Sequence, residues 1–158
     1  MANTDAVLHS RSPEETFTIG RNLAARLYRG QTVALIGDLG SGKTCLIQGI
    51  CEGLGVREQV TSPTFILIQE YKGRDCGGSR TPIYHFDLYR LRSPGDLVDL
   101  GWDDYLARSG ICLIEWADRA GDLLPAGTIT IRIEAQNSLE RILKLSDGEQ
   151  NPKNGANP

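Results

Sequence analysis

The sequence predicts an α/β fold in which a mixed β-sheet is flanked by helices and ends in an antiparallel hairpin. Three observations lead to this prediction. Short runs rich in apolar and β-branched residues alternate with segments of helical periodicity. A glycine-rich turn joins one such run, residues 32–36, to a helical segment. Near the end of the chain, two alternating segments, residues 128–135 and 139–146, flank a connection of three residues, which is typical of a hairpin.

The composition of the 158-residue chain is that of an ordinary globular protein, with 40% hydrophobic and 23% charged residues. We expect one domain over residues 1–146. Residues 147–158 are rich in glycine, asparagine, proline and charge, so we expect a disordered tail there. The formal net charge of −3 argues against a protein that binds nucleic acid by itself through phosphate contacts. Any nucleic acid would be reached through partners.

Neither a targeting segment nor a membrane span is predicted. Residues 1–5 lack a basic region followed by an apolar one. No apolar run approaches the length of about 20 residues that a membrane helix needs. We therefore expect a cytoplasmic protein that does not contact a membrane. The cysteines form no C-x-x-C pair, so we expect buried free thiols and not a disulfide or a metal site; they are Cys45, Cys51, Cys76 and Cys112.

The first elements are a short strand and an amphipathic helix. Residues 6–9 favour the strand. Ser12 is a helix cap, Pro13 suits the first helical position and Glu15 completes a capping box. Apolar residues then recur at near-helical spacing until Gly30, which we expect to end the helix.

A phosphate-binding motif follows the strand at residues 32–36. It fits the pattern G-x-x-x-x-G-K-[ST] and consists of Gly37, Asp38, Leu39, Gly40, Ser41, Gly42, Lys43 and Thr44. A helical run, residues 44–54, leads out of it, as the motif requires. The glycines let backbone N–H groups turn toward phosphate oxygens, and the helix N-terminus adds a positive dipole end. The alternative is a purely structural role, as a glycine-rich turn that binds no ligand.

These eight residues are predicted to bind the phosphates of a nucleotide. We expect Lys43 to reach the β- and γ-phosphates and the Thr44 hydroxyl to ligate Mg²⁺. The fold class is therefore a single-domain P-loop NTPase. No [NT]-K-x-D stretch follows the loop, so the sequence favours ATP over GTP.

A candidate catalytic carboxylate ends a buried strand. Residues 111–114 are apolar and Glu115 follows them directly, as in a Walker B strand. In a parallel sheet the carboxylate emerges at the edge where the phosphate loop also lies. There it can hold Mg²⁺ or orient the attacking water. We predict both a catalytic and a metal-binding role for Glu115.

The strand predicted at residues 82–91 carries an unusual aspartate. Alternation puts Ile83, His85 and Asp87 on one face. An aspartate in such an apolar strand is costly unless it meets a cation or hydrogen-bond donors. Asp87 is therefore a candidate metal ligand or water-positioning residue, with an ion pair to a nearby arginine as the alternative. We interpret His85 as a half-buried, hydrogen-bonded structural histidine and not as a base.

The segment before the strand at residues 65–71 is a candidate nucleotide sensor. Pro63 pushes the preceding residue out of the helical region, so the chain is extended there. Hydroxyl groups at Thr61, Ser62 and Thr64 could sense a γ-phosphate or its Mg²⁺. The alternative is that these residues are ordinary strand formers.

The remaining elements have mainly structural interpretations. Residues 73–80 indicate a loop between two strands. Short helices are predicted from Ser93 to Gly101 and from Trp102 to near residue 110, and a turn or helix at residues 118–124. Arg119 is a candidate arginine finger, against the commoner exposed ion-pairing role. Further arginines form either a solvated basic edge or a contact with a partner or tRNA; they are Arg74, Arg80, Arg90 and Arg92.

Four blocks, GDLGSGKT, TSPTF, YHFDLYRL and ICLIEWADR, occur in this order between Ser12 and Pro125. Together they make the sequence similar to the TsaE family, the bacterial ATPase of tRNA threonylcarbamoyladenosine biosynthesis. The resemblance implies a small P-loop protein that binds ATP and Mg²⁺. It also implies work with TsaB and TsaD to modify adenosine 37 in tRNAs that read ANN codons. In that role the protein resets the transferase and does not itself transfer the group.

The resemblance also assigns residues. Lys43 and Thr44 match the family's phosphate loop, Asp87 the aspartate of its HFDLYR block, and Glu115 the glutamate of its IEW block, with Trp116 beside it. Thr64 lies in a segment whose family counterpart behaves like a switch, and we count it among the nucleotide-binding residues. The C-terminal hairpin matches in pattern only, so no nucleotide contact is carried onto it.

Two other functions remain open. A small-molecule P-loop kinase would use the same loop to deliver the γ-phosphate to a hydroxyl, but it would need a mobile lid, and no long segment follows Glu115 to supply one. A nucleotide-gated binding module would bind ATP with negligible hydrolysis.

Overall fold

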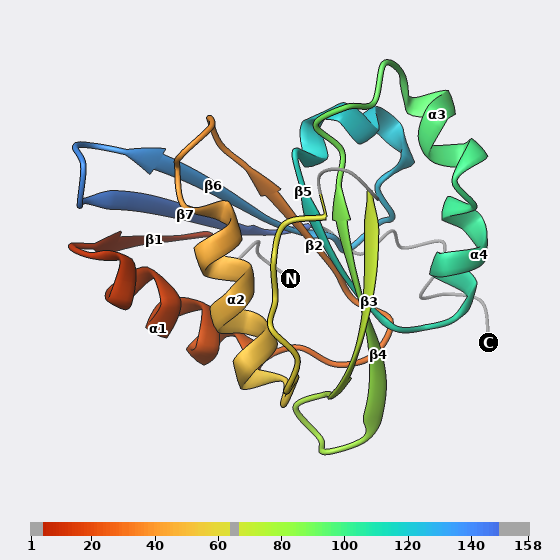
Figure 1. The fold of residues 1–158 in the computed structure, drawn as a ribbon, viewed down its shortest axis with the longest axis horizontal. Helices are drawn as coiled ribbons and strands as arrows, with labels where there is room; N and C mark the ends of the chain where they lie inside the picture. Colours follow the sequence, from red (N-terminus) through yellow and green to blue (C-terminus); the bar gives the residue numbers. More distant parts are fainter. Residues whose placement is uncertain (1–4, 64–66, 149–158) are drawn as a thin grey trace.

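A mixed sheet of seven strands forms the centre of the computed structural model, which describes residues 5–63 and 67–148 (Figure 1). The strands lie in the order β1-β7-β6-β2-β5-β4-β3. Their bounds are β1 (Asp5–Ser10), β2 (Thr32–Ile36), β3 (Ile68–Arg74), β4 (Arg80–Asp87), β5 (Ile111–Glu115), β6 (Ile129–Ala135) and β7 (Arg141–Asp147). The helices are α1 (Pro13–Ala24), α2 (Lys43–Gly53), α3 (Pro94–Asp99), α4 (Trp102–Ala107) and the 3₁₀ segment η1 (Ala117–Leu123).

The central strands are parallel and the outer ones antiparallel. Strand β2 pairs in parallel with β5 and β6, and β5 pairs in parallel with β4. Strand β3 is antiparallel to β4, and β7 is antiparallel to both β1 and β6. Because β2, β5 and β4 run the same way, their carboxyl ends meet at one edge of the sheet. The register puts Asp87 beside Glu115 at that edge.

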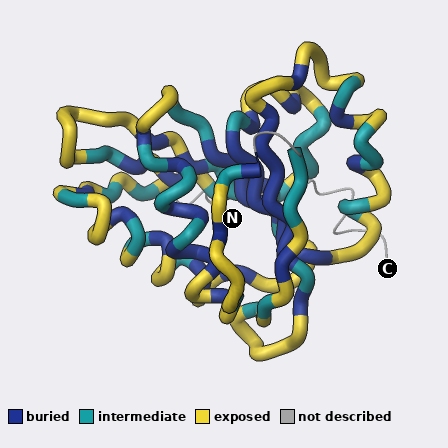
Figure 2. Tube along the Cα trace, in the orientation of Figure 1, coloured by how far each residue is buried: buried dark blue, intermediate teal, exposed yellow. Residues whose placement is uncertain are grey.

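Each face of the sheet carries its own apolar core. Helices α1 and α2 pack on one face, over residues that include Leu35, Leu113 and Ile133. On the other face α3, α4 and η1 cover a second cluster that includes Phe86 and Trp102. Figure 2 shows the buried central strands between these layers. The alternation predicted for β4 is confirmed, since neighbouring residues of this strand belong to opposite cores.

Helices α1 and α2 approach each other closely because glycines line their contact. A Cβ at Gly49 would overlap the carbonyl of Phe17, and one at Gly20 would overlap the carbonyl of Leu46. The absent side chains allow the two backbones to come into van der Waals contact. The helix that begins at the phosphate loop is thus held firmly against α1.

Most predicted elements are confirmed. The strand at residues 6–9 is β1, and the hairpin is β6 and β7. The Ser12 hydroxyl accepts a hydrogen bond from the Glu15 amide at 3.1 Å, as a cap should. The predicted helices after Ser93 are α3 and α4, the latter ending at Ala107.

Several boundaries were wrong. Strand β7 begins at Arg141 and not at residue 139, so the connection in the hairpin is longer than the three residues predicted. Helix α1 ends at Ala24, well before Gly30, and the intervening residues form turns. Strand β4 ends at Asp87 and not at residue 91, because the Asp87 carboxylate accepts the Tyr89 amide at 2.9 Å and turns the chain. Both strands of the β3–β4 hairpin extend into the predicted loop at residues 73–80. Asp147, assigned to the tail, is the last residue of β7; residues 149–158 lie outside the described residues.

The cysteines are free thiols, but only two of them are buried. Cys51 and Cys112 are buried, and burial raises the pKa of each thiol to about 12. Cys45 is half-buried and Cys76 is exposed, so the prediction of buried thiols was wrong for these two. In the described part of the chain, no helix is both long and apolar enough to cross a membrane.

Candidate functional site

The phosphate loop joins the end of β2 to the start of α2, as predicted. Gly40 and Gly42 have φ values of 76° and 105°, a region that favours glycine because other residues meet steric strain there. The Ser41 amide donates to the Asp38 carbonyl at 3.0 Å, which tightens the loop. The amides of Gly42 and Lys43 donate to no other described residue. The loop therefore presents free N–H groups at a helix N-terminus, which is a site for an anion.

Lys43 lies folded onto this loop. Its ammonium group donates to the carbonyls of Gly37 and Asp38 at 2.6 and 2.9 Å. The residue is only 5% exposed. Burial lowers the pKa of Lys43 below its usual value, and the carboxylates of Glu115 and Asp87 oppose that shift. The Lys43 ammonium group therefore lies beside the loop amides, where it could contact a bound phosphate group.

Glu115 connects the phosphate loop to the sheet. The Thr44 hydroxyl donates to Glu115 Oε1 at 2.8 Å, across a sequence separation of 71 residues. Glu115 is 3% exposed and ends β5, the strand next to β2. The predicted meeting of the loop hydroxyl and the strand carboxylate is found in the structure, although the role of each residue stays a prediction.

His85 holds the other oxygen of Glu115. Its Nε2 lies 2.7 Å from Glu115 Oε2, and its side chain is 0% exposed. The interpretation as a hydrogen-bonded histidine is confirmed, but half-burial was wrong, because both faces of β4 are covered. His85 Nδ1 is buried and has no hydrogen-bond partner among the described residues. Because a carboxylate oxygen accepts, Nε2 is the donor in the contact with Glu115.

Asp87 is the second carboxylate of the site and is 3% exposed. The Ser62 hydroxyl donates to Asp87 Oδ2 at 2.6 Å and lies 3.3 Å from Glu115 Oε2. The extended segment predicted as a sensor is therefore linked to both carboxylates through Ser62. Thr61 is exposed, and Thr64 lies outside the described residues.

Trp116 covers the ammonium group of Lys43. The Nζ atom lies 4.1 Å from the centroid of the indole ring, a cation–π distance. Trp116 has a φ of 56°, which is uncommon for a large side chain and indicates backbone strain at the end of β5. Its ring also packs against Tyr89, with centroids 4.9 Å apart. The strained turn thus places an aromatic face over the buried cation.

Arg119 does not enter this cluster. It is exposed, donates to the Leu91 carbonyl at 3.2 Å and stacks over the rings of Tyr89 and Trp116. Its contacts with Tyr89 and Trp116 place it beside the aromatic cover and give it a packing role.

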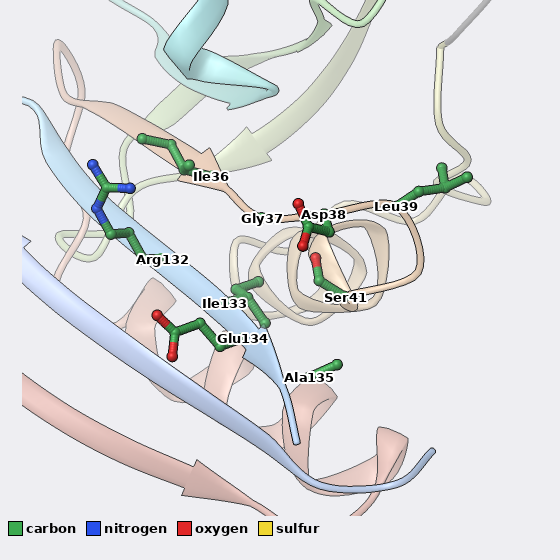
Figure 3. Close-up of a pocket in the computed structure, with 9 residues that line it drawn as sticks. All are labelled: Ile36, Gly37, Asp38, Leu39, Ser41, Arg132, Ile133, Glu134 and Ala135. Carbon is green, nitrogen blue, oxygen red and sulfur yellow. The ribbon is translucent and has the colours of Figure 1, made fainter. Parts of the chain in front are cut away.

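A cavity of about 290 Å³ adjoins the loop (Figure 3). Its lining combines the end of β2 and the first half of the loop with β6, and consists of Ile36, Gly37, Asp38, Leu39, Ser41, Arg132, Ile133, Glu134 and Ala135. Lys43, Thr44 and the two carboxylates do not line it. The cavity is thus a neighbour of the loop and not part of the carboxylate cluster.

Sequence reasoning missed three participants. His85 was assigned a structural role without its contact to Glu115. Trp116 entered only through the family blocks, and its position directly after the strand carboxylate was the available signal. Arg141 lies at the start of β7 and contacts the loop carbonyls of Gly40 and Ser41. No local pattern indicated this contact, because the two segments are about a hundred residues apart.

The parallel strands, the loop between β2 and α2 and the carboxylate at the end of β5 define a P-loop NTPase fold. The family model described as "Threonylcarbamoyl adenosine biosynthesis protein TsaE" matches residues 10–143. The chain therefore belongs to the TsaE family, and the recognition made from the four sequence blocks is confirmed.

Individual relatives agree with this assignment. The chain is 40% identical over 124 residues to the tRNA threonylcarbamoyladenosine biosynthesis protein TsaE of Treponema pallidum, covering 78% of this chain and 87% of the relative. It is 40% identical over 130 residues to the protein of the same name in Bacillus subtilis, covering 82% and 78%. The crystal structure of YdiB from Bacillus subtilis matches with a TM-score of 0.75 and 33% identity, over 94% of this chain and 88% of that one.

Proposed function

We propose that this protein binds ATP with Mg²⁺ and hydrolyses it in the threonylcarbamoylation of adenosine 37 of ANN-decoding tRNAs. The family description and the names of the relatives support the pathway. The further proposal is that the protein acts with TsaB- and TsaD-type proteins and resets their transferase complex. It contacts tRNA indirectly, through the complex, which agrees with its net charge of −3.

The observation that carries the ATPase proposal is the bond between Thr44 and Glu115. It joins the helix start of the phosphate loop to the carboxylate of the neighbouring strand at 2.8 Å. Lys43 lies buried on the same loop, and the negative charges of Glu115 and Asp87 stabilise its charged form. Phosphoryl transfer to water requires hydrogen-bond donors and positive charge that face the phosphates, together with a carboxylate that can orient the water. Both lie at the same edge of this sheet.

The residues fit a magnesium ion that arrives with the nucleotide. Mg²⁺ takes oxygen ligands, commonly one or two carboxylates together with substrate phosphates and water. Thr44, Glu115 and Asp87 offer such oxygens. Among the described residues no group of three or more His, Cys, Asp or Glu side chains is arranged to hold a metal by itself. When bound, the ion supplies positive charge against the charge that develops on the phosphates.

In the proposed mechanism the free amides of the loop receive phosphate oxygens. Lys43 leaves the carbonyls of Gly37 and Asp38 and neutralises the β- and γ-phosphates. Glu115, held by His85, and Asp87, held by Ser62, keep their oxygens directed at the γ-phosphate side. One of these carboxylates accepts a hydrogen bond from the attacking water and orients it in line with the bond that breaks.

The test is a phosphate-release assay on the purified chain, alone and with TsaB- and TsaD-type proteins. We expect slow release alone, faster release in the assembly, and loss of at least about 100-fold in Lys43→Ala and Glu115→Ala. Glu52→Gln is the matched control, because Glu52 is an exposed carboxylate at the far end of α2.

Full activity of both variants in the assembly would contradict the assignment of the site. Tight ATP binding without phosphate release, even in the complete assembly, would favour a nucleotide-gated binding module. ATP consumption that rises with a small hydroxyl compound and not with the partner proteins would favour a kinase.

A further inference from the structure

Arg141 links the C-terminal hairpin to the phosphate loop. Its Nε donates to the Ser41 carbonyl at 2.8 Å, and one Nη donates to the Gly40 carbonyl at 3.2 Å. The other Nη donates to the carbonyls of Asn137 and Glu140, in the β6–β7 turn, at 2.7 and 2.9 Å. The guanidinium group thus contacts four carbonyls, two in the loop and two in the hairpin turn.

These contacts orient the peptide groups of the loop. In a trans peptide the C=O and the following N–H point in opposite directions. With the Ser41 carbonyl held toward Arg141, the Gly42 amide points away from the hairpin. That amide donates to no other described residue. Gly42 has a φ of 105°, and the nearest atom to a Cβ at Gly42 would be Arg141 Nε, at 3.8 Å.

The orientation has an electrostatic consequence. A loop carbonyl that turned toward the anion site would repel phosphate oxygens, whereas an amide in the same place attracts them. The planar fork of arginine holds two successive carbonyls at once, which an ammonium group on a flexible stem does not do with the same geometry. The hairpin turn anchors the fork from the other side.

We propose that Arg141 is a positioning residue for nucleotide binding: it holds the carbonyls of Gly40 and Ser41 away from the phosphates and so keeps the Gly42 amide directed at them. The proposal rests on the proposed nucleotide-binding function. It gives the C-terminal hairpin a role in the site, although this hairpin contributes no side chain to the cluster around Glu115.

The experiment compares Arg141→Gln and Arg141→Lys with the wild-type chain, with ADP and AMP as probes in isothermal titration calorimetry. Arg141→Gln should weaken ADP binding about 10-fold or more, because the charge-assisted hydrogen bonds that hold the loop carbonyls in place are lost. AMP binding should change much less, since AMP lacks the β-phosphate that the loop amides receive. Arg141→Lys should lose nearly as much ADP affinity as Arg141→Gln, because it keeps the charge but not the fork.

Lys144→Gln is the matched control. Lys144 is an exposed cation on the same strand, and its ammonium group pairs with Glu134 and not with a loop carbonyl. It should leave the Kd for ADP within about twofold of wild type, as expected for an exposed ion pair. Melting temperatures of all variants show whether a change in Kd accompanies a loss of folding.

Each of the remaining results overturns the proposal. Full ADP affinity in Arg141→Lys would mean that charge alone matters. A lower melting temperature with an unchanged Kd for ADP would assign Arg141 to the hairpin alone. Wild-type affinity in Arg141→Gln would remove its role and leave the proposed function intact, whereas a wild-type chain that binds neither nucleotide would overturn both.

Discussion

The two sides of the candidate site are built in opposite ways. The loop side consists of consecutive residues, 37–44, and offers backbone amides and one lysine. The carboxylate side consists of His85, Asp87 and Glu115 and is assembled from two strands that the sheet places in register. The loop side reaches the surface, where Leu39 is 83% exposed. The carboxylate side is buried, so the oxygens of its two carboxylates depend on specific donors.

The two sides should therefore respond differently to substitution. Substitution of Lys43 on the loop side removes a charge whose burial opposes folding, so it should reduce function more than stability. A substitution on the carboxylate side leaves a buried oxygen without its donor and costs stability as well. Four substitutions separate the effect on function from the effect on stability, beginning with the largest.

Lys43→Ala should break the loop side. Phosphate release should fall by at least about 100-fold, because the charge that meets the transferring group is gone. The free energy of unfolding should not fall, since burial of this ammonium opposes folding. The lowered pKa of Lys43 means that this penalty is fully present below the folded-state pKa and disappears as the pH rises to the usual value of 10.5. Urea unfolding at neutral and alkaline pH, with the assay above, measures both effects; a large loss of stability at neutral pH would contradict the comparison.

His85→Leu should break the carboxylate side. Glu115 Oε2 would lose its 2.7 Å partner in a buried place, so the free energy of unfolding should fall by about 2 kcal/mol. Phosphate release should fall by about 10-fold, because Glu115 loses its orientation.

The matched control is His9→Leu, which alters the only other histidine of the sequence, an exposed residue on β1. It should change neither quantity appreciably. Equal unfolding free energies for the two variants would show that the His85 contact contributes nothing to stability.

Ser62→Ala should sharpen the comparison. Ser62 Oγ is 2.6 Å from Asp87 Oδ2, and loss of this donor should cost about 1 kcal/mol of unfolding free energy. The effect should be smaller than that of His85→Leu, because Ser62 is only half-buried, so water can replace its hydroxyl, whereas His85 is 0% exposed. Ser138→Ala, at the exposed hairpin turn, is the control. If Ser62→Ala cost more than His85→Leu, the ranking of the two carboxylates would be wrong.

Leu39→Ser should have the smallest effect. Its side chain lies mostly in solvent, so the free energy of unfolding should change by less than about 0.5 kcal/mol. The loop conformation depends on the glycines on either side and not on this residue. Thermal unfolding and ADP titration would check it. A clear loss of ADP affinity would indicate that the Leu39 side chain contacts the ligand, and a clear loss of stability would contradict the prediction from its exposure.

The sequence correctly predicted that Lys43, Thr44 and Glu115 lie close together. The phosphate loop and Glu115 each stand at the end of a predicted strand, and the carboxyl ends of parallel strands meet at one edge of the sheet. It was less complete for His85. Alternation assigned the face of β4 correctly, but a periodic pattern does not say which residue of the next strand lies opposite. Thr64, a predicted nucleotide-binding residue, lies outside the described residues, so its role stays a prediction.

The fold was predicted in class and in most elements, with errors at boundaries. Strand β4 was predicted too long because Leu88 and Leu91 continue its apolar pattern. Tertiary structure ended it earlier, through the turn that Asp87 forms with Tyr89. Helix α1 was predicted too long because its apolar spacing persists to Leu27, which is buried even though it lies beyond the helix.

The sequence by itself determined the phosphate loop, because glycine, lysine and threonine at fixed spacing act through their own backbone and side chains. It also determined the membership of the TsaE family through its four blocks. Only the tertiary structure decided that His85 and Ser62 hold the two carboxylates, that Trp116 covers Lys43, and that Arg141 holds the loop. These contacts join residues from different strands and turns, and their partners depend on the register of the sheet and on the packing of the hairpin. Local sequence does not encode either.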